Sequence, residues 1–176
     1  MPLPMPFEEN GVRVDFPDAN NFRLSDCEAY KAIKSKGVKE MDIGWFDTTS
    51  NTLWLVELKG FHNPANIKHQ PKDLSNPTIV GSVMEELLDK SIHTICQVTT
   101  DRAGTKSCVG QPIADDTAIK IVHLIRVMPG QDAYLDPMQD AIRNKLRPFI
   151  AIYNIGAVAV ISYDYAVSNR LLNWII

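Results

Sequence analysis

The strongest periodic signal in the chain lies between residues 77 and 98. Hydrophobic residues recur there at every third or fourth position, which is the spacing of one face of an α-helix. The members of this face are Val80, Val83, Met84, Leu87, Leu88, Ile92, Ile95 and Val98. Asn76-Pro77 precedes them and suits the start of a helix. The pattern predicts one long amphipathic helix.

Two hydrophobic runs upstream have the character of strands, Val38–Phe46 and Thr52–Lys59. The turn-rich stretch Asp47-Thr-Thr-Ser-Asn51 joins them, which predicts a β-hairpin. Further strands are expected at 11–16, 118–128 and 156–163.

Two shorter helices complete the pattern. Ser25-Asp-Cys-Glu28 has the form of a capping box that opens a helix, and Gly37 would end it. Asp136-Pro137 would open another helix as far as Leu146, which Pro148 would stop or kink. Residues 60–77 and 101–117 are expected to be irregular loops. The apolar tail, residues 171–176, can pack onto the body or serve as a homodimer contact.

These elements follow one another roughly as β-α-β-β-α-β-α-β. The order predicts an α/β protein with a mixed central sheet flanked by helices. The chain has 176 residues and no internal repeat or low-complexity linker, so we expect one domain over residues 1–176.

Composition adds little beyond the class of a globular protein, since 45% of residues are hydrophobic and 22% are charged. No apolar run approaches the roughly 20 residues that cross a bilayer, and no signal peptide is evident. The three cysteines form no CxxC pair and fit a reducing compartment, so a cytoplasmic location is expected. The net charge of −3 argues mildly against broad phosphate contacts, although a local groove can still be positive.

The predicted hairpin carries carboxylates among large apolar residues, where an uncompensated charge would cost several kcal/mol. Strand parity places Glu57 and Lys59 on one face, and Glu40 and Asp42 on one face of the other strand. If Phe46 pairs with Leu53, Asp42 lies opposite Glu57 and Glu40 lies opposite Lys59. Directly opposed Cβ atoms are about 4.5–5.5 Å apart, close enough for two carboxylates to share an ion.

Two carboxylates held this close need a cation between them or a shared proton. Oxygen ligands with open water positions favour Mg²⁺ or Mn²⁺. A lysine two residues beyond Glu57 can help to activate water and can stabilise charge on a phosphoryl group. Asp42, Glu57 and Lys59 together therefore predict a site for phosphodiester hydrolysis.

The same residues carry a resemblance to a known family. Asp42, fifteen positions before Glu57-Leu58-Lys59, resembles the bipartite motif of the PD-(D/E)xK nuclease superfamily, with Met41 where the motif's name has proline. The resemblance covers about residues 22–128 and implies a restriction-endonuclease-like fold. It also implies that Asp42, Glu57 and the carbonyl of Leu58 hold Mg²⁺, and that Lys59 serves the water.

Many members of this superfamily add a glutamate from the preceding helix. Glu28 is the positional candidate, although it is also the last residue of the capping box. Glu40 competes with it because it shares the face of Asp42. Lys90, in a polar stripe with His93 and Gln97, is a possible accessory that either turns toward the site or lies on a solvated face.

The expected partner is nucleic acid, DNA before RNA, with no membrane. The chain shows no appended module for reading bases. An alternative prediction is a catalytically inactive nucleic-acid-binding or structural protein on the same fold.

Overall fold

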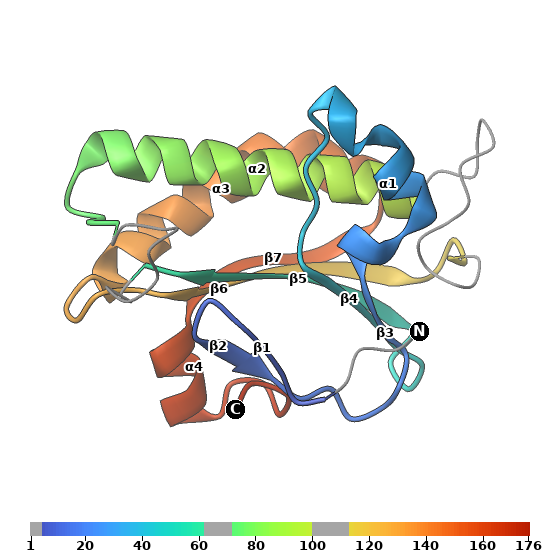
Figure 1. The fold of residues 1–176 in the computed structure, drawn as a ribbon, viewed down its shortest axis with the longest axis horizontal. Helices are drawn as coiled ribbons and strands as arrows, with labels where there is room; N and C mark the ends of the chain where they lie inside the picture. Colours follow the sequence, from blue (N-terminus) through green and yellow to red (C-terminus); the bar gives the residue numbers. More distant parts are fainter. Residues whose placement is uncertain (1–4, 62–71, 100–112) are drawn as a thin grey trace.

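The computed structural model describes residues 5–61, 72–99 and 113–176. Five strands form one sheet in the order β3-β4-β5-β6-β7 (Figure 1). These strands are β3 (Asn21–Arg23), β4 (Ile43–Asp47), β5 (Thr52–Gly60), β6 (Ala118–Arg126) and β7 (Ile155–Ser162). Pairing is antiparallel from β3 to β5 and parallel from β5 to β7. The predicted α/β class with a mixed sheet is therefore confirmed.

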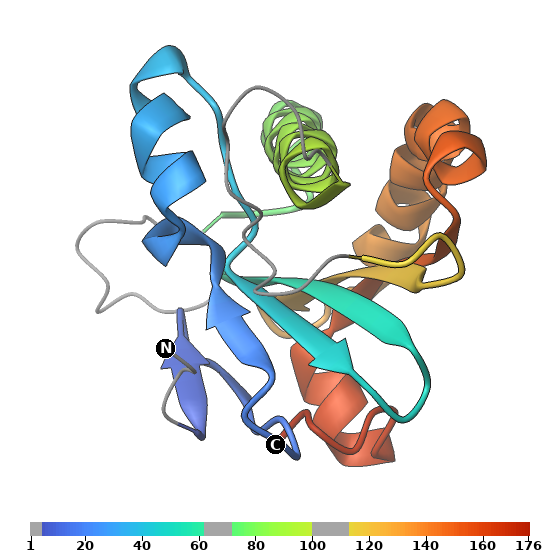
Figure 2. The ribbon, with the colours of Figure 1, turned by 90° about the vertical axis from the view of Figure 1, so that its right-hand side faces the viewer.

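The two faces of the sheet are covered by different elements (Figure 2). One face carries α1 (Glu28–Ile33), α2 (Pro77–Thr99) and α3 (Leu135–Ile152). The other carries α4 (Tyr163–Asn169), the C-terminal tail and a separate hairpin of β1 (Phe7–Glu9) and β2 (Val12–Val14).

The central strand β5 divides its side chains between two hydrophobic cores. Leu53 and Leu55 join the core beneath α2 and α3, whereas Val56 and Leu58 join the core on the opposite face. A strand buried on both faces is apolar throughout, as the sequence of β5 is except near its C-terminal end. The exceptions, Glu57 and Lys59, lie on the α2 side by the same alternation.

Aromatic residues fill the second core. Phe16 packs on Trp45 and on Trp174, each with ring centroids 5.1 Å apart. Trp54 meets Trp174 edge-on at 5.5 Å. The C-terminal tail therefore packs onto the body, which was one of the two alternatives expected for it. The hairpin tryptophans, Trp45 and Trp54, lie in this second core and face away from the carboxylates. Trp174 is 1% exposed, so its apolar character needs no partner chain.

The predicted long helix is confirmed as α2. For the helix that opens near Asp136, the predicted end at Leu146 is wrong. α3 continues through Pro148 to Ile152. A proline inside a helix removes the hydrogen bond to the carbonyl four residues earlier, here that of Asn144. Both residues are exposed, so water can take the place of the lost donor.

The start of α1 also differs from the prediction. Ser25 lies in a 3-10 turn, Leu24–Asp26, and the N-cap of α1 is Cys27, without a side-chain cap bond. Gly37 does end the helical segment, after a second 3-10 turn, with φ +79°.

Two strand predictions need adjustment, and one strand of the sheet was not predicted. The strand near residues 11–16 exists as β2, but it belongs to the separate hairpin rather than to the main sheet. The first strand of the sheet is β3, which spans three residues and lacks a clear sequence signal. The strand expected from Val38 begins only at Ile43. Most of the loops expected at 60–77 and 101–117 lies outside the described residues.

Cysteine usage differs from the expectation of free thiols. Cys27 is disulfide-bonded and Cys96 is free, while Cys108 lies outside the described residues. A disulfide at Cys27 does not fit the expected reducing compartment. Across the described ranges, no helix has both the length and the apolar character to cross a membrane.

Candidate active site

The site begins where β4 and β5 meet. The pairing on which the sequence argument depended is present, since Phe46 pairs with Leu53. The ladder ends at the Ile43–Val56 pair, one position before Asp42. Asp42 nevertheless stays beside β5, because its N–H donates to the Val56 carbonyl at 3.1 Å and its Oδ2 accepts from the Leu58 N–H at 2.7 Å.

Residues 39–41 leave the sheet for α2. The Lys39 N–H donates to His93 Nδ1 at 3.0 Å, and the buried Met41 N–H donates to Thr94 Oγ1 at 2.9 Å. The chain is therefore held on the helix, and the predicted pairing of Glu40 with Lys59 is wrong. Glu40 instead lines a cleft between α1 and α2.

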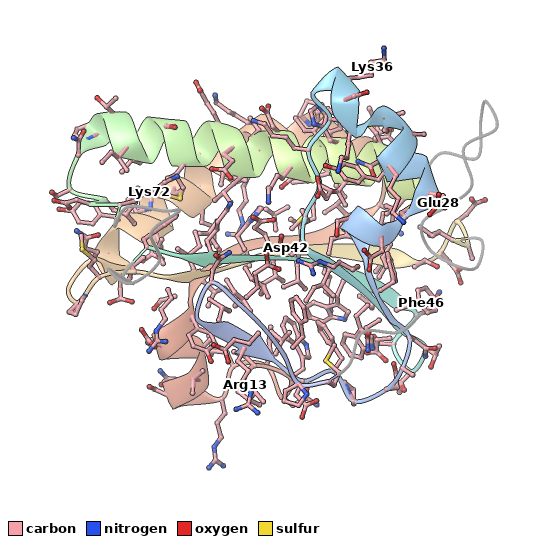
Figure 3. The ribbon with its side chains drawn as sticks, viewed as in Figure 1. Arg13, Glu28, Lys36, Asp42, Phe46 and Lys72 are labelled. Carbon is pink, nitrogen blue, oxygen red and sulfur yellow. The ribbon has the colours of Figure 1, made fainter. Side chains whose placement is uncertain are left out.

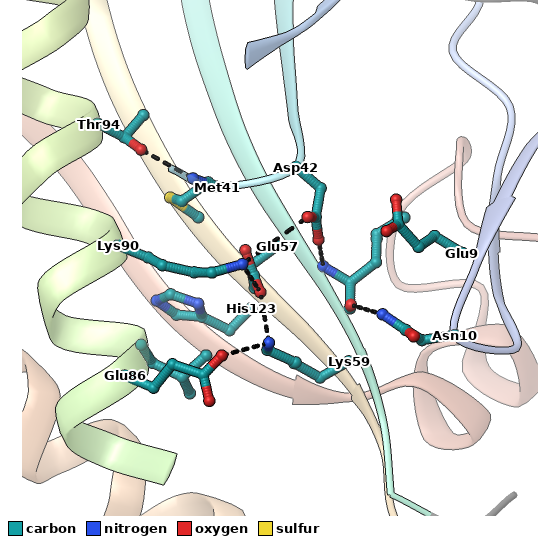
Figure 4. Close-up of polar contacts among 12 residues, drawn as sticks. Glu9, Asn10, Met41, Asp42, Glu57, Lys59, Glu86, Lys90, Thr94 and His123 are labelled. Atoms are coloured by element: carbon teal, nitrogen blue, oxygen red, sulfur yellow. Dashed lines mark hydrogen bonds and ion pairs between the residues drawn. The ribbon is translucent and has the colours of Figure 1, made fainter. Parts of the chain in front are cut away.

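Glu57 is the centre of the polar cluster. Its side chain is 0% exposed, and its Oε1 lies 2.7 Å from Lys90 Nζ and 3.2 Å from Lys59 Nζ (Figure 4). Lys90 Nζ also lies 3.8 Å from Asp42 Oδ1. The structure thus brings together Asp42, Glu57, Lys59 and Lys90, and Lys90 turns toward the site rather than into solvent.

A second carboxylate, which the sequence analysis did not single out, holds Lys59 from the other side. Glu86 Oε1 on α2 lies 2.6 Å from Lys59 Nζ, and Glu86 Oε2 lies 3.7 Å from Lys72 Nζ. Glu86 precedes Lys90 by one helical turn. The four-residue spacing to Lys90 places Glu86 on the same helical face, but many other polar residues of α2 weaken this as a sequence signal.

The electrostatics of the cluster follow from burial. Burial raises the pKa of Glu57 to about 8, the Asp42 carboxylate adds to that rise, and Lys90 and Lys59 oppose it. Burial alone would lower the pKa of Lys59, but the carboxylates of Glu57 and Glu86 outweigh it and raise this pKa above its usual value. Even with both lysines beside it, Glu57 therefore ionises less readily than an exposed glutamate.

Two side chains hold the backbone N–H and C=O of Leu58. Asp42 accepts from its N–H, and Asn10 Nδ2 donates to its carbonyl at 2.9 Å. Asn10 and Gly11 form the tip of the β1–β2 hairpin with φ of 56° and 76°, the left-handed values of a tight turn. This tip lies against Gly60, where an added Cβ would come within 1.9 Å of the Asn10 carbonyl oxygen. The N-terminal hairpin is therefore a wall of the site.

Glu9, next to that tip, adds a further carboxylate. Its Oε2 accepts from Arg23 at 2.9 Å. Burial raises the pKa of Glu9, and the Asp42 carboxylate raises it further. Figure 4 shows Glu9 on the same side of β5 as Asp42 and Asn10.

Glu28 lies away from this cluster. It is in the first turn of α1, its side chain is 79% exposed, and its Oε1 lies 2.8 Å from Lys31 Nζ. Figure 3 shows it well separated from Asp42. The structure does not bring Glu28 to Asp42 and Glu57, which leaves the predicted third carboxylate without support at that position.

His123 is the neighbour of Glu57 on β6 and is fully buried. Ser91 Oγ donates to the Leu87 carbonyl at 2.8 Å, so its contact of 3.1 Å with His123 requires His123 Nε2 to be the donor. His123 Nδ1 then carries a free lone pair and has no hydrogen-bond partner in the described part of the chain. Burial, with Lys90 and Lys59 nearby, lowers the pKa of His123 to about 3.

Two recesses adjoin the cluster. A cleft of about 500 Å³ between α1 and α2 is lined by Tyr30, Glu40, Glu86, Asp89 and Lys90, among others. A smaller recess of about 70 Å³ lies between the hairpin tip and β5 and includes Lys59, Lys72 and Glu86. Glu86 borders both, whereas Lys90 lines only the larger recess and Lys59 only the smaller one.

The donor set bears on whether a metal ion fits. Within the described ranges, no group of three or more His, Cys, Asp or Glu side chains lies close enough to hold one. Asp42 and Glu57 nevertheless share one cation, the Lys90 ammonium. Glu57 Oε2 is buried without a partner there, and the Leu58 carbonyl keeps a second lone pair beside the Asn10 bond. This oxygen set fits Mg²⁺, which commonly takes its remaining ligands from water and substrate.

Comparisons of the chain with protein-family models, curated proteins and solved structures find no match. The class that the structure itself defines is an α/β protein with a mixed five-stranded sheet flanked by helices.

Proposed function

We propose that this chain is a Mg²⁺- or Mn²⁺-dependent nuclease of the PD-(D/E)xK type that hydrolyses phosphodiester bonds of DNA or RNA. The observation that carries the proposal is the convergence of Asp42 and Glu57 on one cation position, with the ammonium of Lys59 beside it. The two strands that deliver these residues are adjacent in the sheet.

Each residue has a role that follows from its contacts. Asp42, Glu57 and the Leu58 carbonyl would hold the metal ion, which supplies charge stabilisation for a phosphodiester when bound. Asp42 and Asn10 keep the Leu58 peptide in place through its two ends. Lys59 lies between Glu57 and Glu86, which fixes its ammonium where it can stabilise negative charge on a phosphoryl group.

The reaction itself is a hydrolysis. Water forms the new bond to phosphorus, the bond to one sugar oxygen breaks, and that oxygen takes up a proton. Lys59 would contribute by stabilising the charge that develops on phosphorus-bound oxygens.

One observation favours a second candidate function, that of a catalytically inactive protein. Lys59 and Lys90 already satisfy the charge of Glu57 without a metal ion. A buried ion-pair network of this kind can be purely structural. The chain would then be a catalytically inactive protein on the same scaffold that binds nucleic acid or serves a structural role.

The test is a cleavage assay with supercoiled plasmid, single-stranded DNA and RNA, in Mg²⁺, Mn²⁺ or EDTA. Wild type and Lys59→Ala are compared with Lys145→Ala, which removes an exposed lysine of α3. We expect metal-dependent cutting that EDTA abolishes and that Lys59→Ala reduces by about 10²–10³-fold. Cutting that survives in Lys59→Ala contradicts the assigned centre. Absence of cutting on all three substrates favours the inactive protein.

A further inference from the structure

Lys90 lies where a divalent metal ion would be expected. Its Nζ is 2.7 Å from Glu57 Oε1 and 3.8 Å from Asp42 Oδ1, and the Lys90 and Asp42 side chains are each only 15% exposed (Figure 4). The two carboxylates from neighbouring strands therefore already share a cation, and that cation is delivered by α2.

An ammonium and a metal ion cannot both take this position. Mg²⁺ binds carboxylate oxygen at about 2.0–2.1 Å. An ion held by Asp42 and Glu57 together, through the two oxygens that Lys90 contacts, would need the space that the Lys90 ammonium fills. Like charges this close repel strongly in a partly buried site. Lys59 is shared between Glu57 and Glu86, whereas the Lys90 ammonium is the cation that lies between Asp42 and Glu57, so a metal ion at that position would repel it directly.

The structure offers Lys90 another place. The cleft between α1 and α2 has a volume of about 500 Å³ and includes Lys90 in its lining. Its other lining residues include the carboxylates of Glu40 and Glu85, together with Glu86 and Asp89, which pair with Lys59 and Lys39. Glu86 precedes Lys90 by four positions, which is the favourable order for an ion pair along a helix.

We propose that Lys90 is an intramolecular competitor for the metal ion. In the metal-free protein its ammonium bridges Asp42 and Glu57 and keeps the buried carboxylates compensated. Metal binding displaces the ammonium into the acid-lined cleft between α1 and α2. This inference rests on the metal site of the proposed function and adds a residue-level mechanism for how that site fills.

The test measures binding of Mn²⁺ alone by isothermal titration calorimetry, without nucleic acid. Lys90→Gln removes the competing charge and keeps a hydrogen-bond donor, so we expect it to bind Mn²⁺ about tenfold or more tightly than wild type. Lys90→Arg keeps the charge and can bind carboxylates with two donors, so it should bind Mn²⁺ about tenfold more weakly.

One control variant and one independent readout separate competition from other effects. Lys72→Gln removes a lysine that pairs with Glu86 at 3.7 Å. Because the Lys72 ammonium is partly exposed and solvent screens its charge, this variant should change Mn²⁺ affinity by less than about threefold. Thermal unfolding gives an independent readout. In EDTA Lys90→Gln should melt below wild type, and Mn²⁺ should raise its Tm by more than it raises the Tm of wild type.

Opposite shifts in Lys90→Gln and Lys90→Arg support the exchange. If both variants bind Mn²⁺ like wild type, or both more weakly, and Asp42→Asn abolishes binding, the competition is wrong but the metal site stands. If neither wild type nor Lys90→Gln binds Mn²⁺, the metal site of the proposed function fails together with this inference.

Discussion

At the scale of single residues, the cluster is organised by the burial of Glu57. A carboxylate that is 0% exposed is unfavourable unless it is compensated, and here two lysines from different elements supply the compensation. Lys59 is two residues along β5, whereas Lys90 comes from α2. The strand and the helix are thereby tied together at the site, and removing either lysine leaves Glu57 dependent on the other.

His123 makes the metal-free protein sensitive to acid. Its pKa is lowered to about 3 in the folded protein against 6.5 as the ordinary value, so between these pH values the unfolded chain binds the proton and the folded chain does not. Stability contributed by this residue is therefore lost as pH falls below 6.5, by at most about 1.4 kcal/mol per pH unit.

The check is urea denaturation in EDTA at pH 4.5 and 6.5, with wild type beside His123→Gln. Glutamine can still donate to Ser91 but does not titrate. We predict a shallower loss of unfolding free energy with acid in the variant. Equal losses in the two proteins would mean that His123 is not the residue that senses pH.

At the scale of elements, the N-terminal hairpin is positioned by a close backbone contact. An added Cβ at Gly60 would lie 1.9 Å from the Asn10 carbonyl oxygen. That oxygen belongs to a main-chain turn, so it cannot rotate away as a side chain could. The hairpin tip would have to move, and its bond to the Leu58 carbonyl would move with it.

Gly60→Ala is therefore expected to lower the free energy of unfolding by about 1–3 kcal/mol. Gly81→Ala is the matched control, because Gly81 lies in α2 with nothing within 4 Å of an added Cβ. It should raise stability by about 0.5–1 kcal/mol. Chemical denaturation of the two variants beside wild type measures both effects, and a neutral Gly60→Ala would contradict the close packing of the hairpin tip.

The edge strand β7 is protected by side chains of α3. Arg143 Nε donates to the Val158 carbonyl at 2.7 Å, and Gln139 Oε1 accepts from the Val160 N–H at 3.0 Å. Free backbone groups on an edge strand otherwise invite pairing with a second copy.

Replacing both residues with alanine should produce concentration-dependent association, which light scattering after size exclusion can detect. Lys145→Ala with Arg147→Ala, two exposed positions of the same helix, is the control and should behave as wild type does. Identical profiles for the Gln139/Arg143 double variant and wild type would show that these two side chains do not guard the edge.

The sequence predicted the elements whose patterns are long and local. α2 follows from its helical periodicity, and β5, β6 and β7 follow from their apolar runs. The Phe46–Leu53 pairing was only a condition in the sequence argument, and the structure supplies it. β3 was not predicted because a three-residue edge strand is too short for its hydrophobic alternation to be recognised. Glu40 was misplaced because the bonds of Lys39 and Met41 to α2 are tertiary and leave no mark on the local pattern.

The candidate site was predicted as far as its hairpin. Glu57 and Lys59 lie on β5 and Asp42 directly precedes the neighbouring strand β4, as expected from the hairpin. Lys90 could be suspected from its helical stripe. Asn10-Gly11 was a readable turn signal, but its contact with Leu58 depends on how a separate hairpin docks. Glu86 and His123 reach the site through the packing of α2 and β6 on β5, which a single sequence does not specify.

At the scale of the whole molecule, the fold places the polar cluster at a junction of four elements. Asp42 lies directly before β4, β5 brings Glu57 and Lys59, α2 brings Lys90 and Glu86, and the N-terminal hairpin closes one side (Figures 1 and 4). Both hydrophobic cores lie beside this junction, so the carboxylates are fixed by packing rather than by mobile loops. A preorganised charged site of this kind suits electrostatic catalysis.

The most direct test of the nuclease proposal is the cleavage rate of an end-labelled oligonucleotide as a function of Mg²⁺ concentration. Wild type is compared with Asp42→Asn and with Asp140→Asn, the same substitution at an exposed position of α3. The proposal predicts that the wild-type rate rises with Mg²⁺ to a plateau, that Asp140→Asn matches it, and that Asp42→Asn is slower by about 10²–10³-fold at every concentration. An Asp42→Asn protein that cuts at the wild-type rate, or cutting that persists in EDTA, would contradict it.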